Sequence, residues 1–433
     1  MIKDRTIQPA LQTISELPAF EVKRTLLDNE IPLQYLKVGS QELLKMQISI
    51  PAGIIHQNQA LLAFFTNKML KESSRNYTAT QIAENLDFFG AFLETKISRD
   101  QANITLFCLH KYLDQILPIL TDLLTQPIFS SKELDILVAQ EKQSFLVRME
   151  KLKTIAQREF SKQIFGAEHP YGKHAELKDY DLIETAALQA FFRQHYHPTN
   201  WKIYLTGYVQ EETIASINRY LGSIPSSEIA GKSSVIPNIS SLISPPNIHW
   251  VAKEGALQTA LKMGKSIINR RHEDFPALAL TQTILGGYFG SRLMQNIRED
   301  KGYTYGIYAN IQHYQHSSFF SISTEVGTEV TQNSIAEIKL ELQRLRNETI
   351  QEEELQLVKN YMAGSLLRSL NGPFALGEMM KIIEEQKLSL QYYSDFINAI
   401  HEINSEKVME TAQNYLTEDS MHLVLVGEKQ EPK

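Results

Sequence analysis

The stretch LGGYFGSRLMQNIREDKGYTYG, residues 285–306, is the most informative part of this chain. Its first glycines permit a sharp turn into a helix, and Gly302 is placed to end that helix. A strand should follow, on which Tyr303 and Tyr305 alternate onto one face. Arg298 is then expected to converge with Tyr305 across the corner between helix and strand. A guanidinium and a phenol together can hold a peptide carbonyl or an oxyanion; the alternative is a surface arginine and a tyrosine at the core edge.

This stretch lies in the second of two similar halves. The tripeptide Leu44-Lys45-Met46 recurs as Leu261-Lys262-Met263, 217 positions later. Helical periodicity predicts helices at 58–71, 79–89, 113–124 and 131–151 in the first half, and at 274–285, 291–299, 329–347 and 351–370 in the second. Alternation predicts strands at 91–97, 102–109 and 201–207, and at 303–312, 318–326 and 422–427. The matching order predicts an α+β protein of two homologous domains, each a mostly antiparallel sheet with helices packed on one face.

A connector rich in Ser and Pro separates the halves. Residues 225–248 contain Pro225, Pro237, Pro245 and Pro246 and lack long apolar periodicity, which is typical of an extended linker. The predicted domains are therefore residues 1–224 and residues 249–433, the second of which carries the arginine and tyrosine described above.

The composition is that of a soluble globular protein. Of the 433 residues, 43% are hydrophobic and 21% are charged, and the formal net charge of −7 argues against a general nucleic-acid binder. No run approaches the ~18 apolar residues of a membrane span, and no secretory signal is evident, so we expect a cytoplasmic protein without membrane contacts. The single cysteine, Cys108, lies in an apolar run and is expected to be a buried thiol.

The twelve histidines do not form a recognisable metal motif. Neither His-x-x-Glu-His nor His-Glu-x-x-His occurs. His195 and His197 flank Tyr196 near a helix end, where packing and helix-end roles are expected rather than metal binding. His313 and His316 are spaced so that a strand would place them on opposite faces. The Gly-x-Ser-x-Gly motif of a nucleophilic serine is absent as well, so we expect no metal or other cofactor in this chain.

Residues 285–306 closely resemble the C-terminal half of the pitrilysin/insulinase/mitochondrial-processing-peptidase family, the inverted-zincin metallopeptidases. Leu-Gly-Gly, Ser-Arg-Leu, Ile-Arg-Glu and Gly-Tyr-Thr-Tyr occur in the family's order and spacing. The resemblance spans nearly the whole chain. The chain also resembles the small bacterial members of the family, which work as pairs of different subunits. In such pairs two half-molecules close like a clamshell around a peptide. One supplies the zinc site from its N-terminal domain, and the other supplies an arginine and a tyrosine, which Arg298 and Tyr305 match in spacing.

The resemblance also implies that the N-terminal domain has a degenerate zinc helix. Residues 63–70 align with the family pattern Ala-His-Phe-Leu-Glu-His-Met-Leu, but Phe64 and Lys68 replace the two ligand histidines and Asn67 replaces the general base. Phenylalanine, amide and ammonium cannot perform these roles. Glu141 falls at the third ligand position. We expect either that Lys68 pairs with Glu141 in place of the metal, or that both side chains are solvated in an open cleft.

The sequence leaves three functions to be compared. The resemblance implies a non-zinc-binding subunit of a heterodimeric zinc metallopeptidase, inactive alone, that contributes Arg298 and Tyr305 to a homologous zinc-bearing partner acting on an unstructured peptide. The alternative is a non-catalytic structural or peptide-binding homologue, like the respiratory-complex core subunits that resemble this family. A self-sufficient enzyme would need a nucleophile or metal site that the sequence does not offer. An isolated chain of this kind is also a candidate for homodimerisation.

Overall fold

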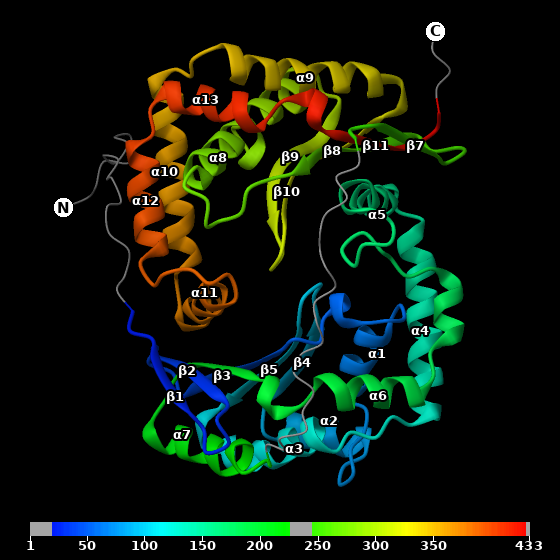
Figure 1. Ribbon diagram of the computed structural model, residues 1–433, viewed down its shortest axis with the longest axis vertical. Helices are drawn as coiled ribbons and strands as arrows, with labels where there is room; N and C mark the ends of the chain where they lie inside the picture. Colours follow the sequence, from blue (N-terminus) through cyan, green and yellow to red (C-terminus); the bar gives the residue numbers. More distant parts are fainter. Residues whose placement is uncertain (1–19, 226–244, 430–433) are drawn as a thin grey trace, which may run out of the picture.

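The chain folds into two similar sheets that lie at opposite ends of the molecule in this computed structural model (Figure 1), which describes residues 20–225 and 245–429. The first sheet has the order β1-β2-β6-β3-β5-β4 and the second β7-β11-β8-β10-β9. Their strands are β1 (Lys23–Leu26), β2 (Pro32–Lys37), β3 (Leu43–Ile50), β4 (Phe92–Ile97), β5 (Ala102–Leu109) and β6 (Lys202–Gly207), then β7 (Ile248–Ala252), β8 (Gln258–Ser266), β9 (Thr304–His313), β10 (Ser318–Gly327) and β11 (His422–Gly427).

Both sheets are antiparallel except for one parallel pair each, β2 with β6 and β7 with β11. Without β1, the strand orders of the two sheets coincide, and the repeated tripeptide lies on the equivalent strands β3 and β8. The predicted two-domain α+β fold and its internal repeat are therefore confirmed. The central strands β3 and β8 bury alternate residues against their own domain's helices, Leu44 and Met46 in the first core and Leu261 and Met263 in the second.

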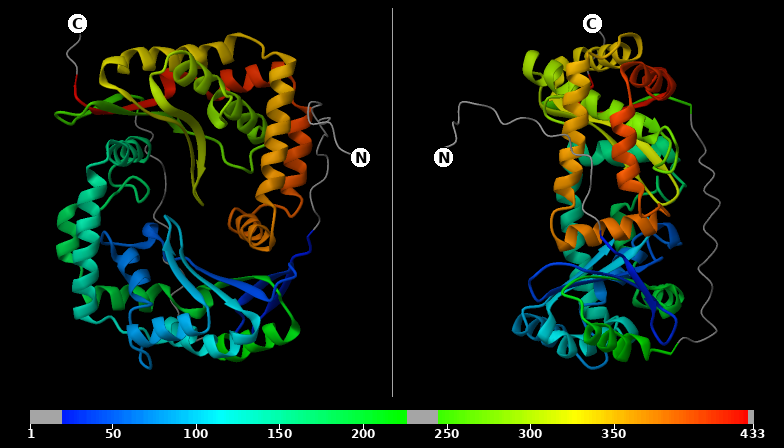
Figure 2. Two further views of the ribbon diagram at one scale, coloured as in Figure 1. Left: turned by 180° about the vertical axis from the view of Figure 1, so that it is seen from behind. Right: turned by 90° about the vertical axis from the view of Figure 1, so that its left-hand side faces the viewer.

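The helices of the first half are α1 (Leu62–Met69), α2 (Ala79–Phe88), α3 (Leu113–Thr125), α4 (Ser131–Met149), α5 (Leu152–Phe165), α6 (Thr185–His195) and α7 (Glu211–Ile217). Those of the second half are α8 (Phe275–Gln282), α9 (Thr331–Asn347), α10 (Glu352–Ser369), α11 (Pro373–Glu385), α12 (Tyr392–Glu402) and α13 (Ser405–Tyr415). Most cover the outer face of their own sheet, as predicted (Figure 2).

The two halves exchange one helix each. Helix α5 of the first half packs on β8 and β11 of the second sheet, where Phe160 and Ile164 join a separate apolar cluster. Helix α11 of the second half packs on β6 and β2 of the first sheet through Met380. Gly377 permits this approach, because a Cβ there would lie 2.3 Å from Thr206 Oγ1. Each sheet thus receives a helix from the other half on its inner face, an arrangement the prediction of helices on one face did not include.

Most of the predicted connector, residues 226–244, lies outside the described residues, and the predicted boundaries at 224 and 249 stay predictions. Cys108 is buried as predicted, and burial raises the pKa of its thiol to about 12. His195 ends α6 with its ring packed 4.4 Å from Phe191 and 5.6 Å from His56, centroid to centroid, which confirms the predicted packing role. In the part of the chain that the structure describes, no helix is long and apolar enough to cross a membrane.

Candidate functional site

The degenerate zinc helix α1 lines a pocket of about 480 Å³. The chain enters α1 through Leu61, whose φ of 71° is a left-handed conformation that is costly for any residue except glycine. Phe64 and Lys68, one helical turn apart, both line the pocket, together with Glu141 from α4 and residues of the edge strand β4. The structure therefore brings together the positions that the family resemblance identified.

Lys68 and Glu141 form an ion pair, as one of the two sequence-based hypotheses predicted. Lys68 Nζ donates to Glu141 Oε1, and the two side chains are only 28% and 14% exposed. Arg148 Nη1 lies 3.8 Å from Glu141 Oε2, and the Lys68 ammonium lies 5.6 Å from the centroid of the Phe64 ring. An unpaired carboxylate at this depth would be costly. The Lys68 ammonium thus compensates the charge of the Glu141 carboxylate.

Asn67 is locked into a neutral hydrogen bond. It is 1% exposed, and its Oδ1 accepts from the hydroxyl of Tyr196 at 3.1 Å. Burial raises the pKa of Tyr196, which keeps its hydroxyl protonated as a donor. With a phenyl, an amide and an ammonium at its key positions, this pocket does not fit zinc. Among the described residues, no group of three or more His, Cys, Asp or Glu side chains could hold a metal ion.

Arg298 lies in the last turn of the π-helical segment Met294–Asp300. Its guanidinium carbon lies 4.5 Å from the centroid of the Phe289 ring, and its Nη1 donates to Glu299 Oε1 at 2.6 Å. Phe289 is itself 65% exposed. Stacking holds the plane of a guanidinium while its N–H edges remain available to an acceptor. Phe289 was not singled out from the sequence. The available signal was its place between Gly287 and Gly290, four residues after the end of the predicted helix 274–285.

Tyr305 is presented by a β-bulge. Thr304 pairs with Val326 and Ile307 with Thr324, so Tyr305 and Gly306 together oppose a single residue of β10. The extra residue breaks the alternation, and Tyr305 becomes 94% exposed on the edge strand β9. Thr304 braces the bulge, because its Oγ1 accepts from Gly306 N–H at 3.1 Å and donates to the backbone carbonyl of Glu325 at 2.7 Å.

The expectation that Tyr303 and Tyr305 share a face is therefore wrong. Tyr303 packs against the second core, whereas Tyr305 faces solvent. The predicted convergence of Arg298 with Tyr305 is also not seen as a contact: within the described residues no hydrogen bond or ring contact joins them. The close packing of helix and strand beneath them depends on Gly286, where a Cβ would lie 2.6 Å from Ala309 N. Gly302, with a φ of 65°, makes the turn from the helix into the strand. The Tyr305 side chain therefore faces solvent, whereas the Arg298 guanidinium is held by Phe289 and Glu299.

Comparison with known proteins identifies the family. A model described as Insulinase (Peptidase family M16) matches residues 40–168, and a model described as Peptidase M16 inactive domain matches residues 183–362. The chain belongs to the peptidase M16 family. The two M16 matches lie one after the other along the chain, the first covering the degenerate helix and the second covering Arg298 and Tyr305.

Similar M16 proteins carry contrasting names. The Bacillus subtilis "Uncharacterized zinc protease YmxG" is 22% identical over 413 residues, which cover 92% of this chain and 94% of that protein. The Helicobacter pylori "Non-peptidase homolog YmxG" is 24% identical over 387 residues, covering 82% of this chain and 88% of that protein. The crystal structure of a peptidase M16 inactive domain from Pseudomonas fluorescens superimposes with a TM-score of 0.82 at 23% identity, covering 95% of this chain and 99% of that one. The fold is thus shared over almost the full length.

Proposed function

We propose that this chain is the non-zinc-binding subunit of a heterodimeric M16 metallopeptidase that acts on peptides. The observation that carries the proposal is Tyr305, a tyrosine 94% exposed on a braced bulge at a sheet edge, for which the described residues 20–225 and 245–429 provide no hydrogen-bond partner. The ion pair of Lys68 and Glu141 supports the same proposal, because it makes the chain's own pocket stable without a metal.

In this proposal Arg298 and Tyr305 act in the active site of a homologous partner, which would supply the zinc. The hydroxyl of Tyr305 donates a hydrogen bond to the oxyanion that develops on the scissile carbonyl. The guanidinium of Arg298, held on the Phe289 ring, donates to the peptide backbone and fixes its position. The substrate would be an unstructured peptide that adds as a strand to a sheet edge of the partner.

The alternative is a non-catalytic structural or peptide-binding homologue. The name of the Helicobacter pylori relative, a non-peptidase homolog, favours a chain without peptidase activity of its own. Both proposals therefore expect the isolated chain to be inactive. They differ in whether Arg298 and Tyr305 matter for any activity, which only the first requires. The cytoplasmic location and homodimerisation of the isolated chain remain predictions, the latter to be checked by light scattering.

The deciding experiment mixes the purified chain with a homologous subunit that has an intact His-x-x-Glu-His motif. Cleavage of a quenched fluorescent, unstructured peptide should be absent for this chain alone, even with added zinc, and present for the mixture. A partner whose motif glutamate is replaced by glutamine should be inactive in the same mixture, since chemistry occurs at the partner's site. Chelator-sensitive cleavage by this chain alone would contradict the proposal.

A further inference from the structure

Lys262 on β8 is the counterpart of Lys45 on β3. The two lysines occupy the centre of the repeated tripeptide, and their neighbours along each strand belong to their own domain's core. Alternation therefore turns both ammonium groups to the inner face, where the exchanged helices pack. The internal repeat places one positive charge at the same point of each sheet, which allows their surroundings to be compared directly.

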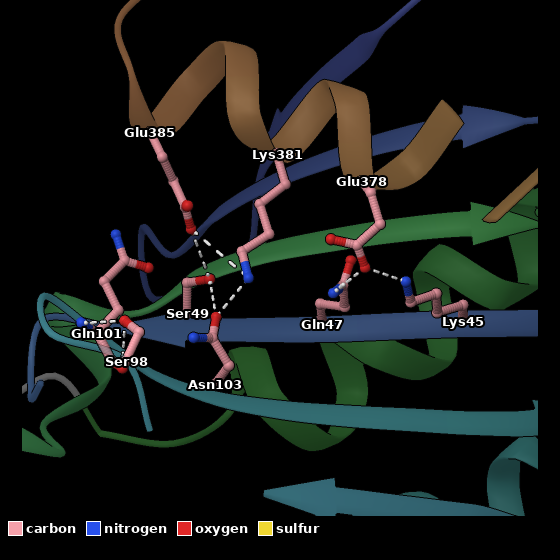
Figure 3. A network of polar contacts seen from close by, with 9 residues as sticks. All are labelled: Lys45, Gln47, Ser49, Ser98, Gln101, Asn103, Glu378, Lys381 and Glu385. Atoms are coloured by element: carbon pink, nitrogen blue, oxygen red, sulfur yellow. Dashed lines mark hydrogen bonds and ion pairs between the residues drawn. The ribbon is translucent and has the colours of Figure 1, made fainter. Parts of the chain in front are cut away.

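In the first sheet the charge is compensated by the exchanged helix α11. Lys45, 5% exposed, donates to Glu378 Oε1, and Gln47 Nε2 donates to the same oxygen at 2.7 Å (Figure 3). Farther along the helix, Lys381 lies 3.7 Å from Glu385, Nζ to Oε1. Lys45 of the sheet and Lys381 of α11 therefore each have a carboxylate partner, as buried charges require.

In the second sheet an aromatic ring stands where the first sheet has a carboxylate. Helix α5 presents Phe160 to the Lys262 ammonium, with the ring centroid 5.3 Å from Nζ. The hydrogen bond from Nζ goes to Ser323 Oγ at 2.9 Å, on the directly opposite residue of β10. In the described parts of the chain, no carboxylate pairs with Lys262. Burial without a counter-ion lowers the pKa of Lys262 to about 8.

Lys262 and Ser323 open into a polar pocket of about 510 Å³ between the second sheet and α11. Most polar side chains of its lining can donate hydrogen bonds; beyond Lys262 and Ser323 these include Gln157, Arg270, Asn310, Gln312 and Ser321. Arg270 adds a second positive charge to the pocket. His313 also lines the pocket, and burial, followed by the charge of Arg270, lowers its pKa to about 3. Glu385 is the one carboxylate in this lining, and it already interacts with Lys381 and Ser49.

We propose that this pocket binds the carboxylate of an extended peptide, with Lys262 and Arg270 as its cationic partners and Ser323 as a further hydrogen-bond partner. A peptide C-terminus and an Asp or Glu side chain both carry this group. The inference deepens the proposed function, because it names carboxylate-bearing peptides as the class that the chain holds. Its test uses this chain alone, so its failure is distinguishable from failure of the partnership.

The test is calorimetric titration of the chain with three unstructured peptides of one sequence. One has a free C-terminus and a central Gln, one is amidated with a central Glu, and one is amidated with the Gln. We expect one or both carboxylate peptides to bind about tenfold more tightly than the amidated Gln peptide, as for a hydrogen bond to a charged group. Comparison of the two carboxylate peptides shows whether the C-terminal or the side-chain carboxylate binds. A separate titration with sodium acetate shows whether a free carboxylate ion binds without a peptide. Equal affinities, or no binding by any peptide, would overturn the proposal.

Lys262→Met should abolish the preference, whereas Lys265→Met should leave it intact. Lys265 is a matched control, because its Nζ donates to Ser420 Oγ at 2.9 Å and burial lowers its pKa, but it projects from the other face of β8. A preference that survives Lys262→Met overturns the site.

A second readout needs no variant at Lys262. A bound carboxylate favours the ammonium form, so binding at pH 8.5 should take up protons, measured in two buffers of different ionisation enthalpy. His313 is neutral at this pH, and Glu385→Gln tests whether the carboxyl group of the lining is the source of the proton uptake. Binding without proton uptake contradicts the assignment even if Lys262→Met fails to fold.

Discussion

Removing the Lys68 charge should destabilise the N-terminal domain. In Lys68→Met, the Glu141 carboxylate, 14% exposed, keeps Arg148 as its remaining ion-pair partner among the described residues, with Nη1 3.8 Å from Oε2. Breaking a fully buried pair costs about 3–5 kcal/mol, and exposed pairs are worth about 0–1 kcal/mol. Because Lys68 is 28% exposed and Arg148 compensates in part, we expect a loss of about 2 kcal/mol. For a domain of this size, that corresponds to a fall in Tm of about 4–8 °C.

The assay is differential scanning calorimetry of a double-mutant cycle. Two domains need not unfold in one step, so the transition of the N-terminal domain is followed rather than a global free energy. Lys68→Met/Glu141→Leu should recover most of the lost stability, because no unpaired charge remains. Lys142→Met is the control, since Lys142 pairs with the 63% exposed Asp181 and should matter little. Equal Tm values for the Lys68 and Lys142 variants, or additive losses in the double variant, would refute the reasoning.

Three further predictions concern other parts of the chain. Thr304→Val leaves the Gly306 N–H without its acceptor and should cost about 1–2 kcal/mol, seen as a lower Tm of the C-terminal domain. Burial, and then the charge of His56, lower the pKa of His195 from 6.5 to about 4. Between these two pH values the unfolded chain binds a proton that the folded chain does not bind. The free energy of unfolding should therefore fall by at most about 3 kcal/mol as the pH drops from 6.5 to 4. His195→Phe should flatten this decline in a pH series of thermal scans. Glu378→Leu strands the buried Lys45 and should cost about 3 kcal/mol, with faster hydrogen exchange in α11, whereas adding Lys45→Met should restore protection.

Local periodicity predicted seven of the thirteen α-helices and six of the eleven strands in the described residues. Strands 102–109 and 422–427 occur as predicted, because strict alternation or a continuous apolar run marks a strand at those lengths. The pairing of Lys68 with Glu141 was one of two predicted arrangements, because the family resemblance aligned both positions with the zinc site and a buried carboxylate without a partner is costly. The structure adds the distance and burial that turn this expectation into a geometry.

What sequence could not predict depends on contacts between distant segments. Helices α5 and α11 each show an apolar face, but periodicity does not say which half covers which sheet. The bulge at Tyr305 was missed because alternation assumes an unbroken ladder, and the hydroxyl brace that stabilises the bulge involves β10 as well as β9. That Lys262 has an aromatic ring where Lys45 has a carboxylate becomes visible only when the surroundings of the two lysines are compared.

The central claim is that Tyr305 acts in a partner's active site, and the turnover rate of the mixed subunits carrying Tyr305→Phe tests it most directly. This change removes one hydroxyl from a side chain that is 94% exposed, so folding and assembly should be unaffected. Loss of a hydrogen bond to the developing oxyanion predicts a fall in kcat of about 100-fold or more, with KM little changed. A mixture that cleaves the peptide at the wild-type rate with Tyr305→Phe would contradict the account.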